Sequence, residues 1–348
     1  MHFEPVHTPI GTPTALEPLL HNAANEATGG IWRATGPAGT AVLKHATPGD
    51  GATGPWASGT DAHHWNYWKR EYLAYTTGQT ERYGAGTALR APRLLAAGER
   101  PDGSVELWLE DLPGPFADQW TVEQFAHFAR QLGTAQARHA TTDPQPWHSR
   151  SWLRHYAGRH TPAAVPWDHP AASRHWPEDL RTGLRTLWEH RTDLFDRAAS
   201  FPQTLCHLDV WPMNLTRSGT DPVLIDWAFI GRGAIGEDIA NLIADTFLDG
   251  LQPVDRLDEV KDALIDAYLA GLAEAGRRTG PVPAAIAATG AAKYCWLAPL
   301  MLTRLARGEP LDEGTYEAAA GAGDDAVLAR SRPVLAMLVD WARTALDH

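Results

Sequence analysis

LCHLDVWPMNLTRSGTDPVLIDW, residues 205–227, is the segment whose pattern decides the fold. Two apolar runs flank the sequence Ser-Gly-Thr-Asp-Pro, whose residue types favour a tight turn. We therefore expect residues 213–216 and 223–227 to pair as a β-hairpin centred near residue 220.

This hairpin would place the amide of Asn214 opposite the carboxylate of Asp226, with Asp209 one loop away. Such oxygen ligands suit Mg²⁺, which binds through few protein groups and keeps positions for phosphate oxygens. Taken singly, Asp209 could be a loop cap and Asp226 a carboxylate at a strand end. The three residues together, at this spacing, predict a site for a phosphate-bound metal ion.

The residues His207, Asp209 and Asn214 form the pattern H-x-D-x-x-x-x-N, and the triplet Ile-Asp-Trp follows at 225–227. In these motifs the chain resembles the aminoglycoside phosphotransferase / choline kinase family, small-molecule kinases with a protein-kinase-like fold. The triplet stands where protein kinases have D-F-G, and no A-P-E segment follows, which favours a small-molecule kinase.

The resemblance implies roles for these residues. Asp209 would accept the proton of the substrate hydroxyl, and Asn214 and Asp226 would hold Mg²⁺. His207 would brace the catalytic loop rather than take part in the chemistry. Asp238, at the start of the next helix, would steady this loop, although an acid there could equally complement the helix dipole.

The N-terminal half contains the lysine that a kinase needs to hold the α- and β-phosphates. Lys44 ends the strand-like run 41–44 and is the only lysine among the first 68 residues. A helix is expected over 61–77, with an apolar stripe formed by Trp65, Trp68, Tyr72 and Tyr75. Glu71 lies on the rim of this stripe, so we expect a Lys44–Glu71 ion pair, although Glu71 could be a solvated helix residue.

Two further segments would contact the nucleotide. Residues 29–40, rich in glycine, lie where the phosphate-covering loop belongs, but they depart from the pattern G-x-G-x-x-G. Residues 107–112 resemble the interlobe hinge of the family, where backbone groups near Glu110 and Leu112 would contact the base. An ordinary edge strand followed by a turn would have the same sequence.

The acceptor pocket is expected in the helical lobe beside Asp209. Residues 237–266 contain nine acidic and two basic residues. This negative charge would attract an aminosugar, but the same charge pattern is normal for a solvated helix face. Trp211, Trp227 and Asp238 are the residues that we expect closest to the acceptor, with core packing the plainer role for Trp227.

One motif points to a different class of enzyme. Residues 231–236 read G-x-G-x-x-G and follow a strand-like run, which is typical of an NAD-binding oxidoreductase. An acidic helix follows in place of a second buried strand. We therefore interpret residues 231–236 as a turn that occupies the place of a shortened activation segment. A nucleotide-binding regulator without transfer activity is the other alternative.

Composition excludes several classes of protein. The chain has 348 residues and a net charge of −12, which argues against nucleic acid as a partner. Its two cysteines rule out a disulfide scaffold and a four-cysteine zinc site. The N-terminal sequence does not resemble a signal peptide, and no run of 18 apolar residues predicts a membrane span. We therefore expect a cytoplasmic protein, either a monomer or a homodimer.

The expected architecture is α+β and two-lobed, with a β-rich nucleotide-binding lobe over 1–112, a hinge about 109–114 and a helical lobe over 113–348. Helices in the second lobe are expected over residues 121–140, 180–199, 238–248, 254–277, 283–307 and much of 312–346. The expected function is the Mg²⁺-dependent transfer of a phosphoryl group from ATP to a hydroxyl on an aminoglycoside, nucleoside antibiotic or aminosugar. GTP could replace ATP as the phosphoryl donor. A metabolic kinase for a sugar or amino alcohol is the alternative.

Overall fold

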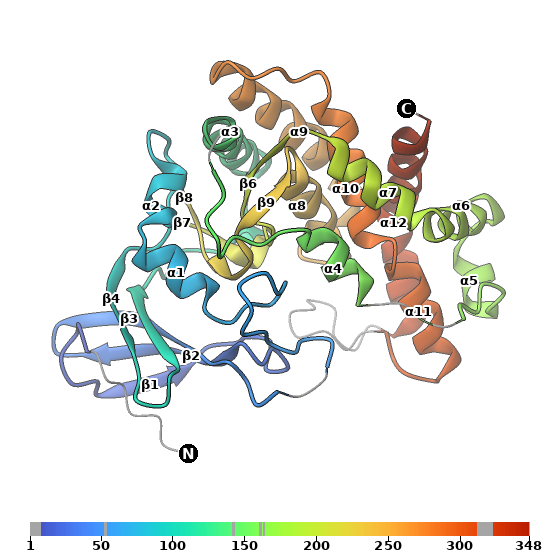
Figure 1. The fold of residues 1–348 in the computed structure, drawn as a ribbon. Coiled ribbons are helices and arrows are strands. Elements are labelled where there is room, and N and C mark those ends of the chain that lie inside the picture. The colour runs from blue at the N-terminus through green and yellow to red at the C-terminus, as the bar shows by residue number, and fades with distance from the viewer. Residues whose placement is uncertain are drawn as a thin grey trace.

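Five antiparallel strands form the sheet of the N-terminal lobe, in the order β1-β2-β3-β5-β4. A computed structural model describes residues 8–51, 54–140, 143–159, 162, 164–311 and 323–347. Figure 1 shows the sheet at the lower left and the helices of the second lobe at the top and right. The strands are β1 (Ala15–Pro18), β2 (Thr28–Gly36), β3 (Gly39–Ala46), β4 (Leu94–Glu99) and β5 (Val105–Glu110).

Strand β3 presents its alternate side chains to two different environments. Ala41 and Leu43 are fully buried in a small cluster with Trp108 on one face of the sheet. Because successive residues of a strand point to opposite faces, Val42 and Lys44 lie on the other face. Val42 packs there against the main core, so the strand directs Lys44 towards the second lobe.

The helix expected over 61–77 begins only at residue 70. Helix α1 spans Arg70–Thr76, and α2 spans Gln79–Gly84. The carbonyls of Ala62, His64 and Trp65 accept hydrogen bonds from the Arg70 guanidinium, and they are therefore not turned towards the amides of a helix. The stripe prediction was wrong for its first two tryptophans, which lie in irregular backbone.

The second lobe is helical, which confirms the expected two-lobed α+β class. Helix α3 is capped by Thr121, whose hydroxyl accepts from the Gln124 amide while the Gln124 side chain accepts from the Thr121 amide. The helices are α3 (Val122–His139), α4 (Trp152–Gly158), α5 (Pro170–His175), α6 (Glu178–Glu189), α7 (Arg191–Ser200), α8 (Glu237–Leu248), α9 (Leu257–Glu274), α10 (Val282–Tyr294), α11 (Leu297–Ala306) and α12 (Asp324–Leu346).

Three of the expected helices are shorter than predicted. The segment 180–199 is split at His190, which ends α6 and starts α7. The segment 283–307 is split between α10 and α11, where Pro299 cannot donate to the carbonyl of Cys295. The segment 254–277 starts with a 3₁₀ turn (Val254–Arg256) before α9. Residues 312–322, expected as part of a helix, lie outside the described residues.

Residues 282–306 are long and apolar enough to cross a membrane on length and composition alone. In the structure 83% of the apolar window is buried inside the protein. Helices α10 and α11 therefore behave as core helices of the second lobe.

Two small pairs of antiparallel strands involve residues 203–234, which include the motif residues His207, Asp209, Asn214 and Asp226. Strand β7 (Leu215–Ser218) pairs with β8 (Asp221–Leu224), and Ser218 is opposite Asp221. The turn therefore has two residues, so residue 214 is in register with 225 rather than 226. The expected placement of Asn214 opposite Asp226 was wrong by one residue.

The glycine-rich segment 231–236 forms a strand instead of a phosphate loop. Strand β9 (Gly231–Ala234) pairs with β6 (Gln203–Cys206). A Cβ atom at Gly231 would lie 2.3 Å from the Ser149 carbonyl oxygen, and one at Gly233 would lie 2.8 Å from Leu208 Cδ2. Close packing thus requires these glycines, which removes the reason for a dinucleotide-binding interpretation.

Arg70 connects the two lobes through backbone carbonyls. Its guanidinium is fully buried and donates to Ala62, His64 and Trp65, to the Trp147 carbonyl at 3.0 Å, and to the Ala228 carbonyl at 3.2 Å. Burial lowers the pKa of Arg70 to about 10. The guanidinium therefore satisfies five carbonyls from three separate segments.

We predict that Arg70→Met lowers the free energy of unfolding by about 3–5 kcal/mol, because it leaves buried carbonyls without donors. Chemical denaturation measures this change. Arg278→Met, at an exposed position between α9 and α10, should change it by less than about 0.5 kcal/mol. Equal effects of the two substitutions would contradict the bridging role of Arg70.

Candidate active site

Three charged side chains from distant parts of the chain meet at the junction of the lobes. Lys44 Nζ of β3 lies 2.5 Å from Glu71 Oε2 of α1 and 3.1 Å from Asp226 Oδ1, which follows β8. Glu71 Oε1 also accepts from the backbone amide of Trp227 at 3.2 Å. The predicted Lys44–Glu71 contact is present, and Asp226 extends it into a triad.

Their mutual attraction keeps Lys44 and Asp226 ionised despite burial. Burial alone would lower the pKa of Lys44, but Asp226 and Glu71 raise it above its ordinary value. Burial would raise the pKa of Asp226, but the Lys44 ammonium holds it below its ordinary value. Asp226 retains 36% of its side-chain exposure, against 13% for Lys44. An ionised, partly exposed carboxylate therefore stands beside a buried lysine.

Asn214 links the catalytic loop to the hairpin. It ends the 3₁₀ turn Pro212–Asn214, and its Nδ2 donates to the Asp209 carbonyl at 2.9 Å and to Asp209 Oδ2 at 3.0 Å. Its Oδ1 is thereby left as the oxygen that can bind a metal ion. Burial raises the pKa of Asp209 to about 7, although Lys293 acts to lower it.

His207 is held in one tautomer. Its Nδ1 accepts from the Asp209 amide at 3.3 Å, so Nε2 carries the hydrogen and donates to the Ile225 carbonyl at 3.0 Å. Burial lowers the pKa of His207 to about 4, so the ring is neutral at pH 7. A neutral imidazole therefore ties the catalytic loop to the segment that carries Asp226.

Asp238 holds the strained part of the catalytic loop. Leu208 has a φ of 71°, a left-handed conformation that costs a branched residue free energy. The Asp238 carboxylate, fully buried, accepts from the amides of His207 and Leu208 at 2.9 and 2.8 Å and from Gln136 Nε2 at 2.7 Å. These bonds fit the expected steadying role.

Two expected acceptor contacts do not agree with the structure. Asp238 is fully buried and its carboxylate is engaged by the loop. Trp227 is 1% exposed, packs edge-on against Tyr83 and His207, and donates through Nε1 to the Leu224 carbonyl at 2.9 Å. Neither side chain therefore reaches an acceptor. Trp211 is half-buried in the catalytic loop, so its expected role stays a prediction.

The expected nucleotide-contacting segments lie on or next to β2, β3 and β5, the three interior strands of the N-terminal sheet. Residues 29–40 lie in β2, a two-residue turn and the start of β3. Glu110 ends β5, its amide donates to the Arg93 carbonyl at 2.9 Å, and its carboxylate accepts from Arg90 Nη1 at 2.7 Å. Leu112 lies two residues beyond β5 and is half-buried. The contacts of these segments with a base or phosphates stay predictions.

The donor set fits Mg²⁺ bound together with a phosphate ligand. Within the described residues no group of three or more His, Cys, Asp or Glu could hold a metal ion by itself. The side-chain oxygens of Asn214 and Asp226 would supply two protein ligands, and Mg²⁺ commonly takes its remaining ligands from water and phosphates. These two residues could therefore hold the ion when a nucleotide is bound.

Sequence reasoning did not single out Lys293, Asp245 and Arg159, which interact electrostatically with Asp209. Lys293 of α10 lies 3.6 Å from Asp245 of α8, and Arg159 follows α4. The available signal for Lys293 was its rarity, since the chain has only four lysines. Arg159 carries no comparable mark in the sequence.

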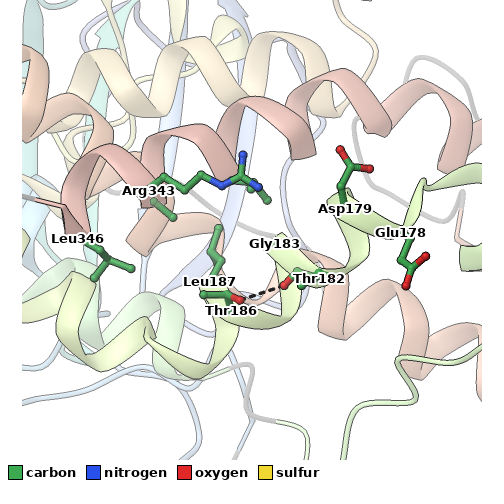
Figure 2. Close-up of a pocket in the computed structure, with 10 residues that line it drawn as sticks. Glu178, Asp179, Thr182, Gly183, Thr186, Leu187, Arg343 and Leu346 are labelled. Carbon is green, nitrogen blue, oxygen red and sulfur yellow. Dashed lines mark hydrogen bonds between the residues drawn. The ribbon is translucent and has the colours of Figure 1, made fainter.

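A cavity of about 590 Å³ lies elsewhere, between α6 and α12. Figure 2 shows Thr182, Thr186 and Leu187 from α6 beside Arg343 and Leu346 from α12. Its lining contains no residue of the catalytic loop, so we do not assign it to the active site.

Comparison with known proteins gives a family match over much of the chain. A model described as the phosphotransferase enzyme family matches residues 79–276, more than half of the chain. No curated protein matches the sequence.

Several solved structures share the fold. Amicoumacin kinase hAmiN, in complex with AMP-PNP, Ca²⁺ and Ami, is 14% identical with a TM-score of 0.53, over 92% of this chain and 87% of that chain. Aminoglycoside phosphotransferase APH(4)-Ia is 14% identical with a TM-score of 0.51, over 96% and 95%. A choline/ethanolamine kinase family protein from Mesorhizobium loti is 16% identical with a TM-score of 0.50, over 96% and 94%.

The burial of Glu237, next to Asp238, should make the stability of the protein depend on pH. Glu237 is 6% exposed, and burial raises its pKa to about 8. In the unfolded chain the Glu237 carboxyl group therefore loses its proton near pH 4.5, whereas in the folded chain it keeps the proton up to about pH 8. The free energy of unfolding consequently falls as the pH rises from 4.5 to 8.

We predict that Glu237→Gln removes this decrease, which amounts to about 1 kcal/mol per pH unit. Denaturation of both proteins at pH 5 and pH 8 measures it, and the variant should gain stability relative to the wild type at the higher pH. Glu274→Gln, exposed at the end of α9, is the control. Parallel pH profiles for wild type and Glu237→Gln would contradict the buried, protonated state.

Proposed function

Because the chain belongs to the phosphotransferase enzyme family and is a small-molecule kinase, we propose that it transfers the γ-phosphoryl group of Mg·ATP to an acceptor hydroxyl. The acceptor would be a polyhydroxylated small molecule of the kind found in aminoglycoside or nucleoside antibiotics and in sugars. The single observation that carries the proposal is the convergence of Lys44, Asp209, Asn214 and Asp226 from both lobes.

Asp209 is the proposed base. Its Oδ2 accepts a hydrogen bond from Asn214 Nδ2, which also donates to the backbone carbonyl of Asp209. The pKa of about 7 keeps the protonated and ionised forms of the carboxyl group close in free energy. A base whose pKa lies near the working pH is effective in proton transfer. Asp209 would accept the hydroxyl proton as the acceptor oxygen bonds to the γ-phosphorus and the bond to the bridging oxygen of ADP breaks.

Lys44 is the proposed phosphate ligand. Glu71 and Asp226 hold its ammonium at the lobe junction, where it would neutralise charge on the α- and β-phosphates. Mg²⁺ bound by Asn214 and Asp226 would supply further neutralisation of the phosphate oxygens. Positioning and charge neutralisation are the main requirements of the loose transition state of phosphoryl transfer.

The presence of all these groups favours an active enzyme over a regulator without transfer activity. A regulator would need only to bind a nucleotide. The hydrogen bond from Asn214 to the Asp209 carboxylate instead suits Asp209 to accept a proton from an acceptor hydroxyl. We therefore expect turnover with a suitable acceptor.

We predict that Asp209→Asn lowers kcat at least about 100-fold, because the amide cannot accept the hydroxyl proton, while Mg·ATP binding changes little. ADP release with a panel of aminoglycosides, nucleosides, aminosugars, amino alcohols and sugars measures turnover, and calorimetry measures binding. Asp221→Asn, exposed at the β7–β8 turn, is the matched control. Wild-type turnover in Asp209→Asn would contradict the assignment of the base.

We predict that Asp226→Asn weakens the Mg²⁺ dependence of nucleotide binding about tenfold or more, because one anionic ligand is lost. Titration of ATP at several Mg²⁺ concentrations measures this change. The same titration on Asp221→Asn should match the wild type. If Asp226→Asn retains the wild-type Mg²⁺ dependence, Asp226 is not a metal ligand.

A further inference from the structure

Lys293 occupies a site with the chemistry of an ammonium receptor. Its side chain is 4% exposed, and Nζ lies 3.6 Å from Asp245 Oδ2. The same Nζ lies 5.2 Å, 5.1 Å and 5.2 Å from the ring centroids of Trp152, Tyr156 and Tyr294. Aromatic rings combined with a carboxylate are the groups with which proteins bind organic ammonium ligands. Here the chain's own lysine fills that arrangement.

This site is joined to the catalytic loop by hydrogen bonds. Asn241 Nδ2 donates both to Asp245 Oδ2 at 3.1 Å and to the carbonyl of Val210 at 2.5 Å. Val210 directly follows Asp209, the proposed base. Burial raises the pKa of Asp209, and Lys293 is the strongest influence acting against that rise. The Lys293 site therefore adjoins the place where the acceptor hydroxyl must bind.

A second cation of the chain lies on the same tyrosine. The Arg159 guanidinium carbon is 3.8 Å from the ring centroid of Tyr156 and 3.9 Å from that of Trp56. Burial lowers the pKa of Arg159, while Tyr156 and Asp209 act to raise it. Tyr156 thus contacts two cations, one from α10 and one from the end of α4.

We propose that Lys293 and Arg159 fill the positions where ammonium groups of an acceptor would bind, so that the chain phosphorylates an uncharged polyhydroxylated acceptor of the sugar or nucleoside class. This inference rests on the proposed function and narrows its acceptor. An incoming ammonium would meet two like charges in a partly buried region, where screening by water is weak. Hydroxyl groups meet no such repulsion and can accept from either cation.

The first experiment examines the ammonium site without turnover. Lys293→Ala removes the propylammonium portion of the side chain, so propylammonium chloride is the probe. We expect it to raise the Tm of Lys293→Ala saturably, with no such effect on the wild type or on Lys261→Ala, a lysine variant on α9. Sodium chloride at the same concentration controls for ionic strength, and propanol controls for the effect of the uncharged propyl chain. The double variant Lys293→Ala/Asp245→Asn should lose the response.

No response of Lys293→Ala beyond that to sodium chloride would overturn the ammonium site. If Lys293→Ala does not fold, Lys293→Met retains the side-chain volume and is tested with acceptors as follows.

The second experiment compares acceptors that differ only in one amino group, such as glucose with glucosamine and a nucleoside with its amino-deoxy analogue. We expect the wild type to favour the uncharged member at least tenfold in kcat/KM, and Lys293→Met to shift this ratio at least tenfold towards the amine. A wild-type preference for the amine, or an unchanged ratio in Lys293→Met, would overturn the inference. Absence of turnover with every pair would count against the proposed function, and the propylammonium titration then decides the ammonium site alone.

Discussion

The ion triad of Lys44, Glu71 and Asp226 is the interaction on which the arrangement of the two lobes depends. A buried ammonium without counter-charges would be expensive in free energy, so β3, α1 and the segment after β8 must stay together. Each carboxylate alone would also be costly to bury. The triad thus couples the N-terminal sheet to the catalytic segment, and it leaves Asp226 as its most exposed member.

The catalytic loop depends on a second set of buried polar contacts. Asp238 accepts from the two amides around the strained Leu208, and His207 joins the loop to the Ile225 carbonyl. Arg70 extends this support by binding carbonyls on both sides of the lobe junction. Lys293 of α10 likewise lies beside the carboxylate of Asp245 of α8. The site is therefore held by buried charges that come from different elements and compensate one another.

Local patterns predicted much of the fold because they reflect short-range physics. The capped helix at residues 122–139 and the strand that ends near Lys44 follow from periodicity and residue type. The segment 61–69 was predicted as a helix and is not one, because the carbonyls of Ala62, His64 and Trp65 accept hydrogen bonds from the nearby Arg70 side chain. Similarly, the hairpin register differed by one residue because a two-residue turn replaced the expected longer one.

The sequence by itself determined the spacing of His207, Asp209 and Asn214, and with it the class of chemistry. It also identified Lys44 through the scarcity of lysine. Only the tertiary structure decided that Asp238 is buried beneath the loop and that Lys293 lies among aromatic rings beside Asp245. The reason is physical: spacing along the chain determines which groups share a loop or a strand. Burial and charge compensation arise only when segments distant in sequence come into contact.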